Sequence, residues 1–421
     1  MKNKEKTELI PELRFGVFPI KNWDEKKLQD IFIYLSTNTY SRNLLNNRQG
    51  IYQNIHYGDI LVKYGSIIDA QKEEIPYINE DIECTTDNII MDGDIIIADT
   101  AEDEIVGKTS EIFNIGDKKI LSGLHTFWLR PLISFAPKYL GYFFNSTQYH
   151  NQLLPLIQGA KVSSISKKAL NNTIIVYPST SEQQKIADCL SSLDDLIEAT
   201  AQKVETLKEH KKGLMQRLFP ADGKNVPDLR FPEFQGAKEW KECSLDEYFD
   251  FKQGFQCPIE EQYDKQELGM VRFIRIIDLT QPSTPYRYIN DPGNQYYINR
   301  ENLFMVRYGD PGLVGIGYEG IIANNLFQLI PKKKINPYFF YFLFSKEKTR
   351  IKGLSSSTSL SAINFTSLKA LKIVVSQNTD EQQKIANCLF SLDELIEATS
   401  RKVEILKEHK KGLMQQLFPK I

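Results

Sequence analysis

The chain has 421 residues, 41% of them hydrophobic and 25% charged, which describes a soluble globular protein of two or three domains. No apolar run is long enough for a signal peptide or a membrane span, and the five cysteines show no CxxC pair. We therefore expect a cytoplasmic protein with reduced thiols and no zinc site. The net charge of −2 gives no support to nucleic-acid binding, so any DNA contact must use local clusters.

The first region, residues 1–180, begins with the lead-in PELRF at 11–15, which is followed by Trp23. Near its end, LISFAPKYLGYFF (132–144) predicts a strand end followed by an aromatic helix. Residues 159–179 then predict a polar loop, a short helix and a β-branched strand. We interpret this region as one domain with mixed α and β structure.

A helical module is predicted for residues 181–220. The stretch EQQKIADCL predicts a short helix with Thr180 or Ser181 as its N-cap. From Leu193 onward the apolar residues alternate in steps of three and four, which is typical of a heptad seam. We therefore expect a second helix of about 26 residues, roughly 39 Å long, that ends at Pro220.

The same order of elements returns in the second half of the chain. PDLRF (227–231) repeats the lead-in, residues 332–344 and 358–377 repeat the two C-terminal segments of the first domain, and Asp380–Pro419 matches Ser181–Pro220 at 32 of 40 positions. The predicted division is two similar domains, 1–180 and 221–379, and two helical modules, 181–220 and 380–421. Because the interiors of the two domains share little, we expect one fold with two different recognition surfaces.

The two long helices most simply pack against each other, antiparallel, about an internal pseudo-twofold axis. Polar residues in the seam, namely Thr200, Lys211, Thr399 and Lys410, would then fix the register. In the alternative arrangement each helix lies on its own domain, which leaves the identity of the exposed residues unexplained. That identity indicates either two copies of one external partner or a recent duplication, and the sequence leaves these two explanations open.

We find no motif for catalysis. GIGYEG (315–320) matches G-x-G-x-x-G, but a strand-like segment follows it and no acidic residue stands about 20 residues further on. Walker A, HExxH and G-x-S-x-G patterns are absent. The sequence therefore predicts a binding and scaffolding protein without catalytic or metal-binding residues.

The repeated pattern resembles the specificity (S) subunit of Type I restriction–modification enzymes. The resemblance rests on the PxLRF lead-ins and on two copies of EQQKIA followed by KKGLMQ and LFP, and it covers the chain from Pro11 to Ile421. It implies two target-recognition domains that each read half of a split site in double-stranded DNA, joined by antiparallel spacer helices. It further implies two docked methylation subunits, which bind S-adenosylmethionine and modify adenine, and restriction subunits, which use ATP and magnesium. The chain itself would hold no cofactor and no active site.

The expected contacts fall into two groups. Polar and basic residues in loops are the candidates for DNA contact, since Arg and Asn can pair with base edges while Ser and Lys hold phosphates. They are Asn38, Tyr40, Ser41, Arg42, His125, Lys161, Ser163, Ser164, Lys252, Gln253, Phe255, Gln256, Arg272, Arg275, Asn324, Asn325, Ser356, Ser357 and Thr358. The candidates for partner contact lie on the repeated helices and are Gln183, Lys185, Glu198, Lys203, Lys211, Gln382, Lys384, Glu397, Lys402 and Lys410.

Two other classes of protein compete with this interpretation. A coiled-coil adaptor with two protein-binding domains would explain the acidic overall charge, and its interactions would lack the steep salt dependence of DNA binding. A self-contained restriction–methylation enzyme would need methyltransferase motifs, which the sequence does not contain.

Overall fold

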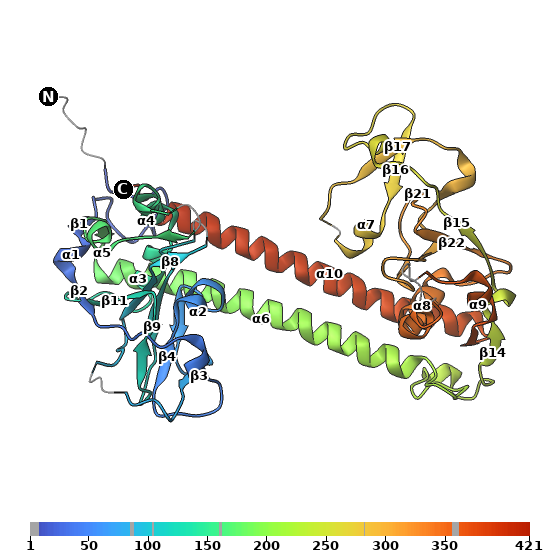
Figure 1. Ribbon diagram of the computed structural model, residues 1–421, viewed down its shortest axis with the longest axis horizontal. Helices are drawn as coiled ribbons and strands as arrows, with labels where there is room; N and C mark the ends of the chain where they lie inside the picture. The colour runs from blue at the N-terminus through green and yellow to red at the C-terminus, as the bar shows by residue number, and fades with distance from the viewer. Residues whose placement is uncertain (1–7, 85–87, 103–104, 160–161, 282, 356–361) are drawn as a thin grey trace. The chain divides into compact units, whose positions relative to one another are not determined.

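The computed structural model describes residues 8–84, 88–102, 105–159, 162–281, 283–355 and 362–421. The chain divides into two compact units (Figure 1). Unit 1 consists of residues 1–201 and 401–421, and unit 2 consists of residues 202–400. Both long helices contribute to both units. None of the helices in the described ranges combines the length and apolar character that a membrane crossing requires.

Unit 1 contains a five-stranded sheet in the order β2-β11-β7-β9-β5, a four-stranded sheet in the order β10-β4-β6-β3, and the pairs β1-β13 and β12-β8. Its strands are β1 (Asp24–Lys27), β2 (Phe32–Leu35), β3 (Leu45–Asn46), β4 (Gln53–Ile55), β5 (Ile67–Asp69), β6 (Tyr77–Ile78), β7 (Ile95–Ala98), β8 (Thr100–Ala101), β9 (Thr109–Phe113), β10 (Ile120–Ser122), β11 (Thr126–Pro131), β12 (Ser163–Ser164) and β13 (Ile174–Tyr177). Its short helices are α1 (Leu28–Ile31), α2 (Tyr57–Val62), α3 (Tyr139–Phe144), α4 (Thr147–Leu153) and α5 (Lys167–Leu170).

Unit 2 repeats this plan with a four-stranded sheet in the order β15-β22-β19-β20, a second sheet in the order β17-β16-β21-β18, and the pair β14-β23. Its strands are β14 (Lys241–Ser244), β15 (Phe249–Gln253), β16 (Met270–Ile274), β17 (Arg287–Asn290), β18 (Tyr297–Ile298), β19 (Leu303–Val306), β20 (Val314–Gly315), β21 (Gly320–Ile322), β22 (Leu326–Pro331) and β23 (Lys372–Val375). Its helices are α7 (Ile276–Thr280), α8 (Pro337–Lys352) and α9 (Phe365–Ala370).

The central strand of each unit is buried on both faces, because successive side chains of a strand point to opposite sides. In β7, Ile95 and Ile97 pack into the aromatic cluster that contains α3, while Ile96 and Ala98 pack into a second cluster around Trp128. Strand β19 divides its side chains in the same way between two clusters. The aromatic helices therefore cover one face of each sheet.

The elements expected at the ends of the two domains are confirmed. The aromatic helices are α3 and α8, the short helices are α5 and α9, and the β-branched strands are β13 and β23. The segment after GIGYEG forms β21 and β22, as expected, so no helix follows these glycines.

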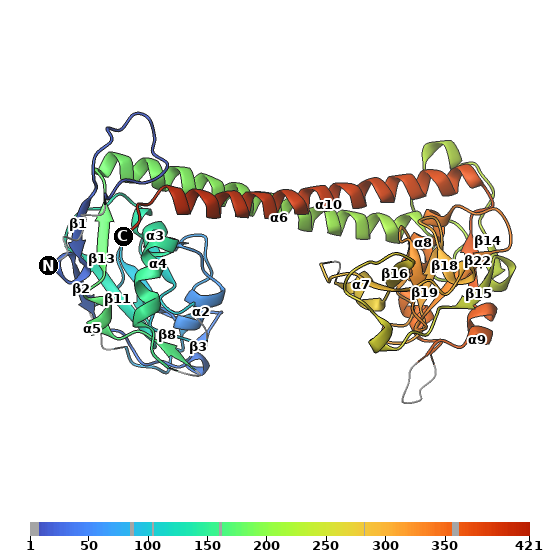
Figure 2. The same ribbon diagram turned by 90° about the horizontal axis from the view of Figure 1, so that it is seen from above.

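The two long helices differ from the expectation in length. Residues Thr180–Leu218 form one helix of 39 residues, α6, and residues Thr379–Gln416 form one helix of 38 residues, α10. The expected break before Leu193 is wrong, because no glycine or proline lies there and the helix continues through Ser191 and Ser192. Figures 1 and 2 show that α6 and α10 run side by side.

An ion pair joins the two helices within each unit. In unit 1, Lys410 of α10 pairs with Asp194 of α6 at 2.6 Å. In unit 2, Lys211 of α6 pairs with Asp393 of α10 at 2.5 Å. The two lysines expected in the seam thus meet repeated acidic partners, and the helices run antiparallel.

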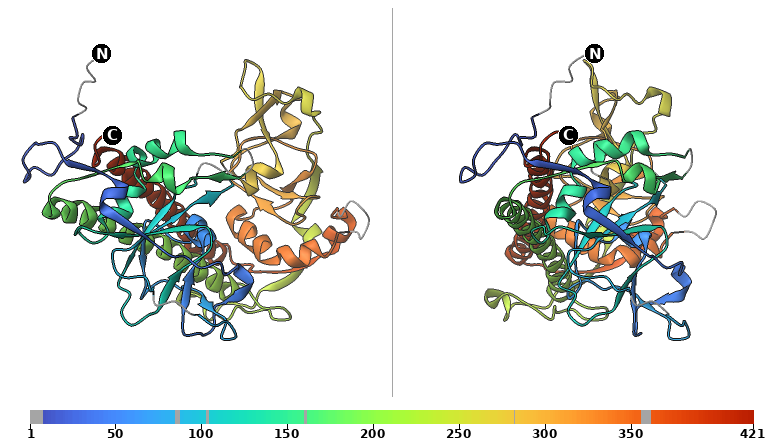
Figure 3. Two further views of the ribbon diagram at one scale, coloured as in Figure 1. Left: turned by 60° about the vertical axis from the view of Figure 1, so that its left-hand side comes forward. Right: turned by 90° about the vertical axis from the view of Figure 1, so that its left-hand side faces the viewer.

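Unit 1 is assembled from both ends of the chain. The backbone N–H of Leu13 in the PELRF lead-in donates to the carbonyl of Gln416 at 2.9 Å, and the Phe418 ring lies 6.4 Å from the Trp23 ring. Figure 3 shows the dark-red end of α10 beside the dark-blue N-terminal segment. Lys420 also pairs with Glu12 at 2.8 Å. The last residues of the second repeat therefore pack into the hydrophobic core of the first domain.

Unit 2 uses the same contacts without a chain end. Leu229 N–H donates to the carbonyl of Arg217 at 2.8 Å, and the Phe219 ring lies 6.0 Å from the Trp240 ring. In each unit, the lead-in thus packs on the LFP ending of a long helix.

Candidate nucleic-acid interface

Three of the loops expected to contact DNA come together in unit 1. The first two meet where Asn38 N–H donates to the carbonyl of Ser122 at 3.0 Å. The Asn38 amide also donates to Asn54 Oδ1 of β4 at 2.7 Å. Ser163 and Ser164 form β12 against β8, and the next residue, Ile165, donates to the carbonyl of Asp99 at 3.0 Å.

His125 occupies the turn between β10 and β11. Its φ of +55° is uncommon for a residue with a side chain, and such conformations gather at functional sites. The exposed imidazole has Nδ1 3.5 Å from Asp99 Oδ1 and meets the Tyr57 ring edge-on at 5.3 Å. The turn therefore presents an imidazole beside a carboxylate and an aromatic ring.

Arg42 lies at the edge of the same group of loops. Its guanidinium pairs with Asp59 of α2 at 2.5 Å, and this hydrogen bond raises the pKa of Arg42. Asp59 is buried, whereas the Arg42 side chain remains 59% exposed. Tyr40 N–H donates to Asn38 Oδ1, and Ser41 is hydrogen-bonded to Asn43. Arg42 keeps free donors for a ligand, while Asn38 is largely occupied within the chain.

In unit 2, the turn equivalent to that of His125 lies between β21 and β22. The side-chain amide of Gln253 donates to the carbonyl of Asn324, and its oxygen accepts from Arg307 Nη1 at 2.8 Å. Asn324 Oδ1 accepts from the Tyr308 hydroxyl at 3.1 Å, and the carbonyl of Asn325 accepts from Arg307 N–H at 2.8 Å. Gln253 and Asn324 therefore hold the shape of this turn.

A second group in unit 2 gathers around Tyr296. Lys252 Nζ donates to the carbonyl of Gln295 and lies 5.5 Å from the Tyr296 ring, which Phe255 contacts at 5.1 Å. Gln256 is exposed. This aromatic and cationic edge is suited to contact with a sugar–phosphate backbone.

The two arginines near β16 have different environments. Arg275 pairs with Asp278 at 3.1 Å and donates to the carbonyl of Pro285 at 2.9 Å, so its guanidinium holds the start of α7. Arg272 instead stacks on Tyr286 and Tyr318. Lys161, Ser356, Ser357 and Thr358 lie outside the described residues.

Sequence reasoning missed Tyr57, Tyr286, Arg307 and Tyr318. Their positions become meaningful only when separate segments meet, although the excess of tyrosine between 286 and 318 could have drawn attention to Tyr286 and Tyr318.

The residues expected to contact partners divide into three sets on the long helices. Gln183 and Gln382 are buried, and their side-chain amides donate to the carbonyls of Pro178 and Ser376. This burial corrects the expectation of partner contact for these two residues, which position the starts of the helices instead. Lys211 and Lys410 join the helices to each other. The exposed set is Lys185, Glu198, Lys203, Lys384, Glu397 and Lys402.

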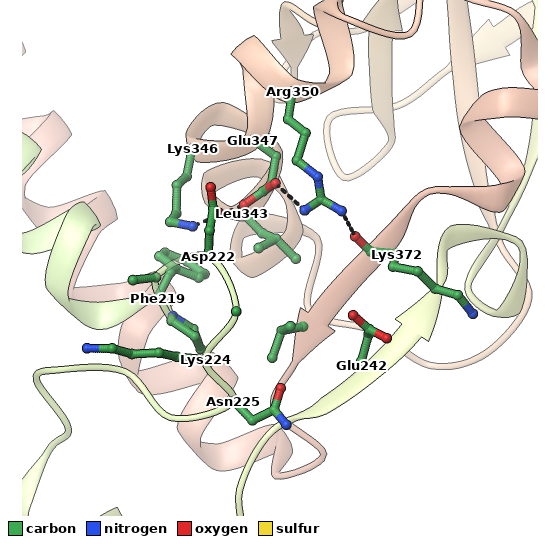
Figure 4. A pocket seen from close by; sticks show the side chains of 14 residues that line it. Phe219, Asp222, Lys224, Asn225, Glu242, Leu343, Lys346, Glu347, Arg350 and Lys372 are labelled. Atoms are coloured by element: carbon green, nitrogen blue, oxygen red, sulfur yellow. Dashed lines mark hydrogen bonds and ion pairs between the residues drawn. The ribbon is translucent and has the colours of Figure 1, made fainter.

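A cavity of about 540 Å³ lies in unit 2 between the end of α6, α8 and β23 (Figure 4). Three of its charged groups pair with one another, since Glu347 pairs with Arg350 at 2.9 Å and with Lys346 at 3.0 Å. Arg350 also donates to the carbonyl of Lys372. The described residues contain no group of three or more His, Cys, Asp or Glu side chains that could hold a metal ion.

Sequence comparison identifies the class of protein that combines these features. Residues 20–209 and 237–408 each match the family described as the Type I restriction modification DNA specificity domain. The chain therefore belongs to this family and carries two copies of its domain, as a DNA specificity subunit of a Type I restriction–modification system. The adaptor interpretation is not favoured.

Individual relatives are similar over nearly the whole length. A protein of Methanocaldococcus jannaschii assigned as the type I restriction enzyme MjaX specificity subunit is 27% identical, over 98% of this chain and 96% of the relative. The type I restriction enzyme MjaIX specificity subunit of the same organism is 24% identical, over 96% of this chain and 94% of the relative.

Solved structures share the fold. The S subunit of a Type I restriction–modification system from M. genitalium aligns over 98% of this chain and all of that chain, with a TM-score of 0.59 and 17% identity. A chain from a structure on complex assembly and conformational transition of the type I R-M system aligns over 95% of this chain and 98% of its own length, with a TM-score of 0.56 and 16% identity.

Proposed function

We propose that each recognition domain reads one half of a split DNA site and that the long helices dock two methylation subunits. The observation that carries this proposal is the construction of the two units. The same lead-in and long-helix ends recur in both, and the strand order β2-β11-β7-β9 of unit 1 corresponds to β15-β22-β19-β20 of unit 2, while the loops on these frames differ. Repetition of the frame supports binding of one partner type twice, and divergence of the loops supports two different half-sites.

The exposed faces of α6 and α10 support the proposed number of methylation subunits. Glu198, Lys203 and their repeats Glu397 and Lys402 are exposed and identical in type. Exposed positions are usually free to vary, so their retention in both repeats fits one binding surface used twice. The proposed stoichiometry is two methylation subunits for each specificity subunit.

The chemistry is proposed to reside in the partners. The methylation subunits would bind S-adenosylmethionine and modify an adenine in each half-site, and restriction subunits would use ATP and magnesium. The specificity chain would contribute recognition and assembly in the cytoplasm without catalysing a step. The pairing of Glu347 with Arg350 and Lys346 in the cavity of Figure 4 fits this division of labour.

Reconstitution with a methylation subunit tests the proposal. Native mass spectrometry should show two methylation subunits for each specificity chain, and the complex should methylate adenine in a random DNA library within one split motif. A complex with the chain's exposed Lys203 and Lys402 changed to Glu should lose methylation subunits while the chain keeps its melting temperature. Unselective methylation by the full complex would refute the proposed recognition role.

A further inference from the structure

Arg272 of β16 has a cationic side chain that no carboxylate accompanies in the described residues. Its guanidinium carbon lies 3.7 Å from the centre of the Tyr286 ring and 5.5 Å from that of Tyr318. The Nε atom is buried and has no hydrogen-bond partner among the described residues. The group is therefore held by two aromatic rings, without a hydrogen-bond acceptor of its own.

The other arginines of this domain provide the comparison. Each has an acidic, amide or carbonyl partner within the unit: Arg275 with Asp278, Arg287 with Asp264, Arg300 with Glu319, Arg350 with Glu347, and Arg307 with Gln253 and the carbonyl of Ile363. Arg272 is the exception between residues 270 and 352 of the described chain.

One tyrosine of this cage, Tyr318, is itself fixed by hydrogen bonds, while Tyr286 is about half exposed. The Tyr318 hydroxyl donates to the carbonyl of Asp278 at 3.1 Å, and the Asp278 carboxylate accepts from Arg275 N–H at 2.7 Å. Stacking on a ring sets the plane of a guanidinium, and because Nε of Arg272 is buried, the fork that is left for a ligand is the pair of terminal Nη groups. Arg272 is therefore oriented before any ligand arrives, and little conformational entropy remains to be lost on binding.

We infer that Arg272 is a specificity-determining residue that donates a pair of hydrogen bonds to a guanine. Guanine places O6 and N7 side by side in the major groove, and this pair matches the arginine fork. The inference deepens the proposed function, on which it rests, by assigning a base to one residue of the domain in unit 2. Tyr286 and Tyr318 act as positioning residues.

A phosphate group could also accept two hydrogen bonds, but it makes no comparable demand on a fixed plane. Phosphates are contacted by lysine, serine and backbone amides as well as by arginine. A cage built from two tyrosines is therefore better explained by a planar base edge, and phosphate contact becomes an outcome of the test.

The experiment maps methylated adenines in DNA from cells that express the full complex with wild-type chain, Arg272→Lys, Arg272→Gln or Tyr286→Leu. The wild-type motif should contain a G·C pair in one half-site at which Arg272→Gln lowers the preference for that pair about 10–100-fold. The other half-site should stay unchanged. Arg272→Lys should behave like Arg272→Gln, since lysine cannot form the fork, and Tyr286→Leu should relax the same position less.

Arg300→Gln is the matched control, because Arg300 is an exposed arginine of the same unit whose partner is Glu319. It should keep the wild-type motif. A motif retained by Arg272→Lys, or a uniform fall in methylation with the motif intact, would assign a phosphate contact and overturn the inference. A variant that loses its half-site altogether, with a lowered melting temperature, would assign a structural role to the cage and would also overturn it. An absence of selective methylation with the wild-type chain would instead refute the proposed function.

Discussion

The recognition domains of the two units differ mainly in the chemistry of the surfaces on a shared frame. Unit 1 joins its loops through amides, hydroxyls and a histidine–aspartate contact, as in Asn38–Asn54 and His125–Asp99. Unit 2 uses tyrosine rings and arginines around β16 and β21. The frame depends on contacts between lead-in and long helix, whereas the loops depend on contacts among themselves. Separation of these two sets of contacts lets the loops diverge while assembly is retained.

The largest expected effect concerns the ion pair that joins each lead-in to a long helix. Arg14 pairs with Glu182 at 2.6 Å in unit 1, and Arg230 pairs with Glu381 at 2.6 Å in unit 2, with all four side chains at most 8% exposed. Removing one partner leaves a buried charge, so Arg14→Ala and Arg230→Ala should each lower the free energy of unfolding by about 3–5 kcal/mol. Denaturant unfolding of the full chain measures this.

The two pairs are not identical, which sharpens the comparison. Glu381 also accepts from the Trp240 indole at 3.1 Å and from the Ser376 hydroxyl at 2.6 Å, whereas the Trp23 indole has no partner in the described chain. Glu381→Gln should therefore cost more stability than Glu182→Gln. Equal losses would show that the additional hydrogen bonds of unit 2 contribute little.

The buried carboxyl of Glu111 predicts that the stability of unit 1 depends on pH. Burial raises the pKa of Glu111 from 4.5 to about 7, although backbone N–H groups of Lys138 and Gly141 donate to its oxygens. The folded state retains this proton where the unfolded chain has lost it. The stability of unit 1 should therefore fall as pH rises from about 4.5 to about 7, by an amount on the order of 3 kcal/mol.

Hydrogen exchange of the amides in α3 can measure this slope locally. The variant Glu111→Gln has no titrating carboxyl at this position, so the stability of unit 1 should no longer fall between about pH 4.5 and about pH 7. The amides of α8 in unit 2 provide the internal reference. A slope that persists in the variant would place the titrating group elsewhere.

The smallest expected effect concerns the ion pairs between the long helices. Lys410–Asp194 and Lys211–Asp393 are partly exposed, so each should contribute no more than about 1 kcal/mol. Lys410→Met and Lys211→Met should each lower the free energy of unfolding slightly and by similar amounts. Each loss should be smaller at high salt, because salt screens the ion pair that the substitution removes. The reversed pair Lys410→Asp with Asp194→Lys is the control for charge, and it should recover most of the loss.

The frame could be predicted from the sequence because it is written twice. The identity between Ser181–Pro220 and Asp380–Pro419 predicted two similar helices, and the heptad spacing placed Lys211 and Lys410 in the seam between them. The structure shows that these lysines pair with Asp393 and Asp194. The ion pair of Arg14 with Glu182 joins residues 168 positions apart, and periodicity gives no information about such a contact. The stretch EQQKIADCL was interpreted as a separate short helix, although Ile186, Leu190 and Leu193 are spaced four and three residues apart, as in one continuous helix.

For the recognition surfaces, the sequence predicted which segments form polar loops but not which side chains face a ligand. Polar composition located the segments around Asn38, His125 and Asn324, but not which side chains the fold would use internally. Gln253 and Arg275 look as free as Arg272 in the sequence, and their different environments arise from tertiary contacts with Asn324, Asp278 and Tyr286.

The most direct test is long-read mapping of methylated adenines in DNA from cells that express this chain with its methylation subunit. We expect one split motif with a modified adenine in each half, and we expect all modification of that motif to disappear when the chain is deleted. A continuous motif, or methylation that persists unchanged without the chain, would contradict the account of two domains that each read half of a DNA site.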